Sequence, residues 1–238
     1  MVQGVPSEHP DDATGLASPE GAGEPLPALE FSLLPHDAQA LAALHLQAFP
    51  TFFLSSLGER FLAEFYRGFV GDPTAVVVVQ RGYDGRPVGV VVGTTEPAGF
   101  FSRLLRRRLW GFVRAAAIAS MRNPRVVPRL LRGVTYRGEA SAAARGALLS
   151  SICVAPELSG GGHGRRLIDA WKLQARALGA ASAHLTTDAA DNDRVNRFYV
   201  ADGWLLSGSF TTPEGRKMNL YTVELTGTSN EQSKDIDA

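Results

Sequence analysis

The spacing of apolar and polar positions predicts an α/β domain between residues 29 and 226. Apolar residues that recur every three to four positions predict helices, and short apolar runs bounded by Gly, Pro or Asp predict strands. We expect helices at residues 37–48, 58–69 and 165–178, the first of them capped by Asp37. We expect strands at residues 30–34, 75–80, 87–94, 148–154, 184–187, 204–211 and 217–225.

Two of these strands form the clearest pair. Residues 75–80 and 87–94 flank Asp84-Gly85, a dipeptide typical of tight hairpin turns. Both strands are continuous in Val, which indicates that their two faces are covered, as beneath flanking helices. By contrast, residues 1–28 and 227–238 are polar and aperiodic, so we expect them to be disordered or flexible tails.

A glycine-rich turn follows the apolar run at residues 148–154. It contains Gly160, Gly161, Gly162, His163 and Gly164. A strand, a glycine turn and a helix N-terminus together suit phosphate, because glycine lets the backbone approach and free amides point at the anion. Arg165 and Arg166 would add positive charge in the first helical turn.

Two familiar nucleotide-binding loops do not fit this turn. A Walker loop needs Lys and then Ser or Thr after its last glycine, and Gly164 is followed by Arg165. A dinucleotide fingerprint needs Gly-x-Gly-x-x-Gly, which no trio of these glycines provides. A glycine turn without a ligand remains the alternative, because glycine content alone is a compositional signal.

Two motifs here resemble those of the GNAT superfamily of acyl-CoA-dependent N-acyltransferases. The first spans residues 159–164 and is similar to the family's Arg/Gln-x-x-Gly-x-Gly/Ala loop. Gly162 and Gly164 match this loop, whereas Ser159 stands where Arg or Gln is usual. The second spans residues 192–204, where Asn-x-x-Val-x-x-Phe-Tyr-x-x-x-Gly-Trp resembles the family's Asn-x-x-Ala-x-x-Phe-Tyr-x-x-x-Gly-Phe.

The resemblance implies a fold and a reaction. The fold would be a GNAT-type mixed, mostly antiparallel β-sheet flanked by α-helices, here with a helical insertion. Acetyl-CoA would be the cosubstrate, and its acetyl group would pass to a primary amine of a small molecule. The family's loop wraps the pyrophosphate of coenzyme A, and the pantetheine arm follows the preceding strand. The residues that would bind coenzyme A are Ile152, Val154, Ser159, Gly160, Gly161, Gly162, His163, Gly164, Arg165, Asn192 and Tyr199.

Amide formation from a thioester needs a neutral amine and a proton for the departing thiolate. By resemblance Tyr199 stands at the position of the family's general acid, and a core tyrosine is the alternative. Glu96 and Asp188 are the candidate general bases, although Asp188 could hold a turn and water could remove the proton. Asn192 would contact the cofactor, cap a helix, or do both. No cluster with metal-ligand spacing is visible, so we expect no metal.

The helix at residues 58–69 carries an aromatic cluster that has two interpretations. Phe61, Phe65 and Tyr66 are most simply part of the core. In the GNAT family, however, the segment after the first helix helps to form the acceptor pocket. The cluster could therefore be core or pocket wall.

Residues 99–146 form a basic helical insertion. Between Phe100 and Arg137 there are ten Arg and no Asp, Glu or Lys. We expect two amphipathic helices that break near Asn123-Pro124. The insertion could be a lid with solvated arginines, a site for an acceptor that carries phosphate, such as an amino sugar, or a docking surface for anionic membranes or nucleic acid.

The overall composition limits the partners and the compartment. The 238 residues carry 24 basic and 24 acidic side chains, so no global field favours nucleic acid or membranes. Cys153 is the only cysteine, which excludes an internal disulfide, and it stands in an apolar run typical of a buried hydrophobe. Without a signal-peptide pattern or a spanning apolar run, we expect a soluble cytoplasmic protein, either a monomer or a homodimer.

Two other functions remain open. One is a module that binds acyl-CoA without turnover. Ser159, which departs from the family loop, favours this function, whereas the presence of Tyr199 argues against it. The other is a basic adaptor that docks on membranes or polynucleotides through residues 99–146.

Overall fold

The computed structural model describes residues 28–50, 53–122, 145–212 and 215–226. The expected tails lie outside these residues, apart from Ala28. The second expected helix of the insertion lies outside them as well. The described residues form one α/β domain.

Seven strands form one sheet in the order β1-β2-β3-β4-β5-β7-β6. Neighbouring strands are antiparallel except β4 and β5, which are parallel. The sheet is therefore mixed and mostly antiparallel, as the sequence resemblance predicted. The strands are β1 (Leu29–Glu30), β2 (Ala75–Arg81), β3 (Pro87–Thr94), β4 (Ala147–Val154), β5 (Ser182–Asp188), β6 (Leu205–Thr211) and β7 (Lys217–Glu224).

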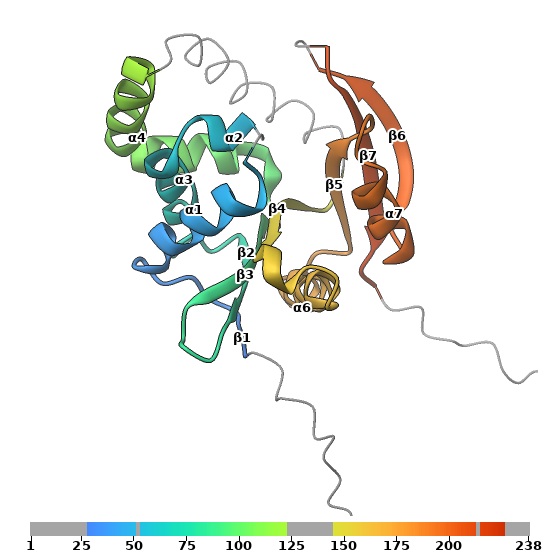
Figure 1. Ribbon diagram of the computed structural model, residues 1–238. Coiled ribbons are helices and arrows are strands. Elements are labelled where there is room, and N and C mark those ends of the chain that lie inside the picture. The colour runs from blue at the N-terminus through green and yellow to red at the C-terminus, as the bar shows by residue number, and fades with distance from the viewer. Residues whose placement is uncertain (1–27, 51–52, 123–144, 213–214, 227–238) are drawn as a thin grey trace, which may run out of the picture.

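Helices cover both faces of this sheet (Figure 1). One face carries α1 (Asp37–Ala48), α2 (Phe53–Ser56), α3 (Glu59–Arg67) and α4 (Pro97–Arg122), and the other carries α6 (His163–Ala177) and α7 (Asp193–Ala201). A short 3₁₀ turn, η1 (Pro156–Leu158), joins β4 to the glycine turn. β1 is shorter than the predicted strand at residues 30–34, because the chain bends at Phe31 and leaves the sheet.

Alternate valines of β2 face two separate apolar clusters. Val77 and Val79 belong to the cluster that contains α1, α3 and α4, whereas Val76 and Val78 belong to the cluster that contains α6. Successive side chains of a strand point to opposite faces of the sheet. The expectation that both faces of this strand are covered is therefore confirmed. Trp171 of α6 is fully buried in the second cluster, and its indole donates to the Val76 carbonyl at 3.1 Å.

An ion pair between α1 and β2 fixes the start of α1. The guanidinium of Arg81 donates to both carboxylate oxygens of Asp37, at 2.9 Å each, and lies 2.7 Å from Glu30. The same carboxylate accepts the Leu34 amide at 3.1 Å. The prediction that Asp37 caps α1 was wrong: it is the first helical residue, and no side chain caps this helix. Arg81 on β2 binds the carboxylate of Asp37 instead.

Three of the described arginines of α4 pair with acidic residues of the domain. Arg107 donates to Asp72 at 3.1 Å, and Arg103 lies 3.9 Å from the same carboxylate. Arg108 lies 3.8 Å from Glu64 of α3. These three arginines therefore bind the domain, whereas the purpose of the insertion stays a prediction.

β4 and β5 separate soon after they meet. They pair only at Ala147 and Leu148 of β4, and beyond Leu148 the two strands diverge (Figure 1). The ladder between β3 and β4 is irregular at the same height, where Leu149 and Ser151 pair with consecutive residues of β3 and leave Ser150 as an extra residue. Such bulges bend a strand and are frequent beside active sites. The gap and the bulge together open the sheet at its centre.

Gly93 of β3 should not tolerate a side chain. An added Cβ would lie 2.2 Å from the Leu148 carbonyl oxygen and 2.6 Å from the Trp171 ring. We expect Gly93→Ala to lower the free energy of unfolding by about 1–3 kcal/mol in urea denaturation, because the strand and α6 must move apart. Gly208→Ala is the matched control, because a Cβ there meets nothing within 4 Å. Equal losses in both variants would contradict this account.

The ion pair of Asp37 should make stability depend on pH. Burial raises the pKa of Asp37, but hydrogen bonds from Arg81 and Leu34 outweigh it and lower that pKa below its usual value. The carboxylate therefore adds stability above the unfolded pKa of about 4, and this stability is lost as the pH falls through the folded pKa.

We expect Asp37→Asn to cost about 2 kcal/mol of the free energy of unfolding at pH 7. The difference from the wild type should shrink as the pH falls below about 4 and through the lowered pKa of the folded protein, where the wild-type carboxyl becomes protonated as well. Urea denaturation of the two proteins at several pH values measures the loss at pH 7 and its dependence on pH. A difference that stays constant down to the acid limit would contradict the role of the ion pair.

Candidate active site

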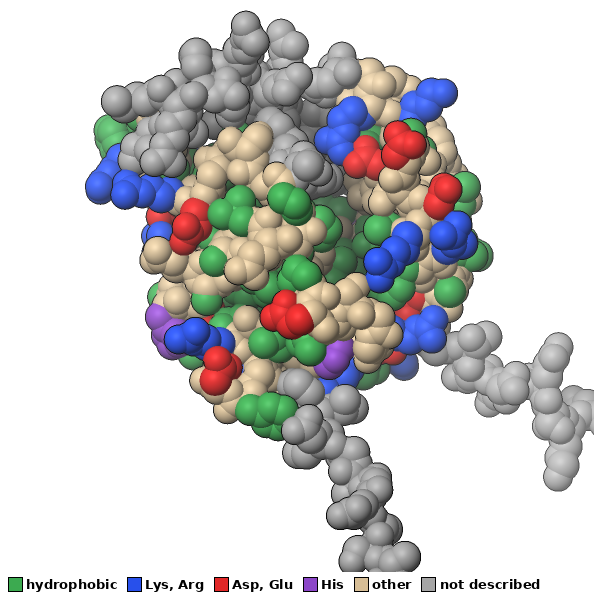
Figure 2. Space-filling model, in the orientation of Figure 1, with side chains coloured by type: hydrophobic (Ala, Val, Ile, Leu, Met, Phe, Trp, Pro, Cys, Tyr) green, Lys and Arg blue, Asp and Glu red, His purple; other side chains and the backbone are tan. Residues whose placement is uncertain are grey.

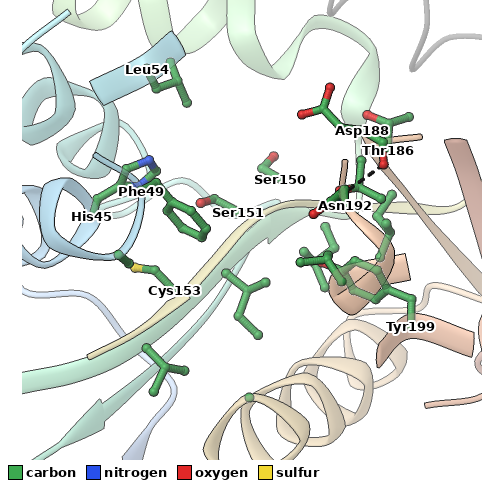
Figure 3. A pocket seen from close by; sticks show the side chains of 18 of the residues that line it. His45, Phe49, Leu54, Ser150, Ser151, Cys153, Thr186, Asp188, Asn192 and Tyr199 are labelled. Carbon is green, nitrogen blue, oxygen red and sulfur yellow. Dashed lines mark hydrogen bonds between the residues drawn. The ribbon is translucent and has the colours of Figure 1, made fainter. Parts of the chain in front are cut away.

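A cavity of about 1310 Å³ lies in the gap between β4 and β5. It extends to both sides of β4, from the glycine turn and α7 to helices α1–α4. All residues of β4 from Leu148 to Val154 line it. Figure 2 shows the hollow, with hydrophobic side chains in its depth, and Figure 3 shows the side chains around β4. The cavity is large enough for an extended ligand together with a second one.

The glycine turn exposes its backbone as an anion-binding site would. Gly160 and Gly162 have φ of +88° and +80°, left-handed conformations that favour glycine. α6 begins at His163, directly after the turn, and no side chain caps its free amides. A Cβ at Gly164 would lie 3.5 Å from Phe198, so the turn lies close to α7. Open backbone, uncapped amides and the helix dipole are together the features of a phosphate-binding turn.

The cavity brings together nearly all of the predicted cofactor-binding residues. Gly161 belongs to the same turn but does not line the cavity. The two sequence motifs therefore meet in one place, although α6 and β5 separate them along the chain. The predicted residues that line the cavity are Ile152, Val154, Ser159, Gly160, Gly162, His163, Gly164, Arg165, Asn192 and Tyr199.

Two of these residues also hold the turn against the domain. The His163 ring nitrogen Nδ1 lies 2.8 Å from the side-chain amide nitrogen of Gln80 on β2. Arg165 donates to the Ala201 carbonyl at 3.1 Å and lies 3.6 Å from Asp202. The glycine turn is thus tied to β2 on one side and to the end of α7 on the other.

Arg194 is a basic lining residue that the sequence analysis did not select. It extends from the first turn of α7 and donates to Ser159 Oγ at 2.9 Å. A guanidinium therefore reaches the position where the family loop usually carries Arg or Gln, but it comes from another element. Its place two residues after Asn192, inside the second motif, is the signal that could have identified it.

Tyr199 projects from α7 toward the gap between the strands (Figure 3). Its ring is buried and packs against Trp204 and Tyr221, with centroid distances of 6.0 and 5.8 Å. Burial and the carboxylate of Asp202 raise the pKa of Tyr199 well above the usual value of a phenol. The hydroxyl therefore stays protonated at neutral pH, which is the state that a proton donor requires.

The two candidate bases lie in different places. Asp188 lines the cavity at the end of β5 and accepts two hydrogen bonds from Arg216, at 3.1 and 2.5 Å. Glu96 does not line the cavity; its side chain is 64% exposed and lies 3.8 Å from Arg103. The structure therefore brings Asp188, but not Glu96, to the space between the strands.

Asn192 holds α7 against β5. Its side-chain amide donates to Thr187 Oγ1 at 2.8 Å and to the Asp188 carbonyl at 3.1 Å. It stands at the N-cap position of α7, but its side chain makes no capping bond, so the capping alternative was wrong. Asn192 thus lines the cavity and fixes the helix that carries Tyr199.

A buried polar chain lies on the other side of β4, and the sequence analysis did not identify it. His45 Nδ1 lies 2.9 Å from Tyr66 Oη, which lies 3.6 Å from Cys153 Sγ. Burial raises the pKa of the Tyr66 hydroxyl, and it raises the pKa of the Cys153 thiol to about 12. Cys153 is buried, as expected, and its thiol stays protonated at neutral pH. The position of His45 on the apolar face of α1, four residues after Leu41, was the available signal.

Two features are absent from the described part of the chain. No group of three or more His, Cys, Asp or Glu side chains there could hold a metal ion. No helix there is both long and apolar enough to cross a membrane.

The fold resembles that of several solved structures. The protein named SsHAT gives a TM-score of 0.59 at 19% identity, over 85% of this chain and 100% of its own. A protein assigned to the GNAT family from Desulfovibrio desulfuricans gives 0.56 at 16% identity, over 83% and 98%. The ribosomal-protein-S18-alanine N-acetyltransferase from Escherichia coli gives 0.52 at 12% identity, over 87% and 99%. At these identities the likeness establishes the fold alone.

The family is established by the sequence. Comparison with curated proteins finds no match. A model of the Acetyltransferase (GNAT) family, however, matches residues 38–204, most of the chain. The match includes the glycine turn, α7 and the open pair of strands between which the cavity lies. The chain therefore belongs to the GNAT family of acetyltransferases.

Proposed function

We propose that the protein transfers an acetyl group from acetyl-CoA to a primary amine of a small molecule. The observation that carries the proposal is the single cavity in which the glycine turn, the open edge of β4 and Tyr199 meet. Membership of the family supports the class of reaction. The acetyl group, the kind of acceptor and the roles of individual residues are our inference.

Coenzyme A would lie along the gap. Its pyrophosphate would bind the uncapped amides at the start of α6, and Arg194 would supply the positive charge that Ser159 lacks. The pantetheine amides would bond to the open edge of β4 near Ile152 and Val154, as an added strand would. Because Arg194 supplies a charge beside Ser159, the main reason to favour a non-catalytic acyl-CoA sensor is weakened.

The acetyl thioester would then lie beside the bulge at Ser150. The amine nitrogen attacks the thioester carbonyl, and the carbon–sulfur bond breaks as the amide forms. The buried Ser150 hydroxyl has no hydrogen-bond partner within the described residues, so it is available to the developing oxyanion. Tyr199 gives its proton to the departing thiolate, and the amine releases one proton.

An amine that binds as ammonium must lose a proton to a base before it attacks, whereas an amine that binds in its neutral form releases its proton only as the amide forms. Asp188 is the carboxylate that lines the gap, whereas Glu96 faces solvent beside Arg103. We therefore assign any base role to Asp188, acting directly or through water, and none to Glu96. An apolar acceptor site would itself favour the neutral amine, because burial disfavours the ammonium form.

Replacing Tyr199 by Phe should slow turnover without loss of the cosubstrate. We expect kcat to fall about ten- to thousand-fold, because the thiolate loses its proton donor, while the dissociation constant of acetyl-CoA stays nearly unchanged. Thiol release from acetyl-CoA measures kcat, and calorimetry measures the dissociation constant of acetyl-CoA. Tyr83→Phe, in the exposed β2–β3 turn, is the matched control. Full activity in Tyr199→Phe would remove this hydroxyl from the chemistry.

Replacing Arg194 by Gln should weaken cofactor binding through the phosphates alone. We expect acetyl-CoA to bind about ten- to hundred-fold more weakly, the usual effect of losing a charged hydrogen bond. Binding of S-acetylpantetheine, which lacks the phosphates, should not change. Arg197→Gln, on the same helix but exposed and outside the cavity, is the control. Equal weakening of both ligands would show that Arg194 acts on the fold and not on the phosphates.

A further inference from the structure

The cavity has two halves that differ in chemistry. The half beside the glycine turn and α7 carries the charged lining residues Arg165, Arg194, Arg216 and Asp188. The other half lies across β4, under helices α1–α4 (Figure 3). If coenzyme A fills the charged half, the amine must approach the thioester from the half under the helices.

The helical half is apolar. None of the described residues of α1–α4 that line it is Lys, Arg, Asp or Glu, and the polar ones are His45 and Gln47. Aromatic rings pack closely in its wall, as between Phe61 and Phe112, whose centroids are 4.8 Å apart. Its apolar lining includes Leu54, Phe61, Phe65, Phe101, Leu105 and Phe112.

The described arginines of α4 do not line this half. Arg103 and Arg107 are bound to Asp72, and Arg108 is near Glu64, and none of the three lines the cavity. A phosphate-bearing acceptor would therefore meet no described cation among the lining residues of α1–α4.

A polycationic acceptor fits no better. Recognition of a polyamine or an aminoglycoside needs several carboxylates near the bound amine. Among the described residues the cavity has one acidic lining residue, Asp188, and Arg216 already binds both of its oxygens. That residue also belongs to the charged half and not to the helical one.

We propose that the acceptor is a primary amine on an apolar body, either an arylalkyl amine or a linear alkyl amine. This inference rests on the proposed function. The apolar body lies among the rings under α1–α4, and the amino group faces the opening of the sheet at Ser150. Binding releases water from the apolar surface of both partners, which is the source of affinity. The same wall disfavours ammonium, so the amine reaches the thioester in its neutral form.

A homologous series of amines tests the proposal. Thiol release from acetyl-CoA is measured with butylamine, hexylamine, octylamine and phenethylamine, against spermidine, kanamycin and glucosamine 6-phosphate. We expect kcat/KM to rise about fourfold for each added methylene until the half-cavity is filled. The charged acceptors should be the poorest of the panel.

Two variants of α4 locate the effect in the cavity. Leu105 lines the cavity, whereas Leu109 lies one turn further on, is 51% exposed and does not line it. We expect Leu105→Ala to lower kcat/KM for octylamine at least about tenfold, with a smaller effect on butylamine. Leu109→Ala should match the wild type. Binding of acetyl-CoA, measured by calorimetry, should be the same in all three proteins.

The outcomes separate this inference from the function on which it rests. A preference for spermidine, kanamycin or glucosamine 6-phosphate would overturn the apolar acceptor and leave the acetyl transfer intact. Rates that do not depend on chain length, or equal losses in Leu105→Ala and Leu109→Ala, would overturn it as well. If acetyl-CoA binds but no amine of the panel reacts, the apolar acceptor is rejected. If acetyl-CoA does not bind, the proposed function itself fails, and the inference with it.

Discussion

The parting of β4 from β5 is the constraint on which the rest of the structure depends. A strand in the middle of a sheet that loses its neighbour leaves backbone N–H and C=O groups without partners, and such groups are costly when buried away from water. Here the two strands stay apart because each packs with its own surroundings. β4 remains paired to β3 and lies between two apolar clusters. β5 is held by β7 and, through Asn192 and Asn196, by α7. The open edge is therefore a consequence of the fold, and it makes the centre of the sheet a place where an extended amide-bearing ligand is stabilised.

Much of this arrangement could be predicted from local sequence. Strands of continuous valine, a glycine turn before an amphipathic helix and a second motif around Tyr199 each depend on neighbours in the chain. The predictions that failed concerned side chains whose partners lie far away in the sequence. Asp is a residue type typical of helix caps, but the carboxylate of Asp37 is bound by Arg81, forty-four residues further along the chain. Arg194 and His45 acquire their roles from residues that no local pattern connects to them.

The distribution of charge shows the same limit of prediction from local sequence. The net charge of zero conceals an arginine-rich segment, and composition alone left its purpose open among a lid, a phosphate site and a docking surface. For three of the described arginines the partners are Asp72 and Glu64, which precede the segment in the chain. With those pairs formed, the face of α4 that carries Leu104 and Phe112 is directed to the interior. Basic residues thus hold an apolar wall in place.

The buried state of Cys153 has a practical consequence for the chemistry of the protein. A thiol whose pKa is about 12 is a thiolate in roughly one molecule in ten thousand at pH 8. Only the thiolate attacks disulfide reagents or is readily oxidised, and this sulfur is in addition 2% exposed. The Cys153 thiol of the folded protein should therefore react little with aromatic disulfides or with peroxide. Liberated coenzyme A can then be followed continuously with such a reagent, with little background from the protein and little inactivation by it.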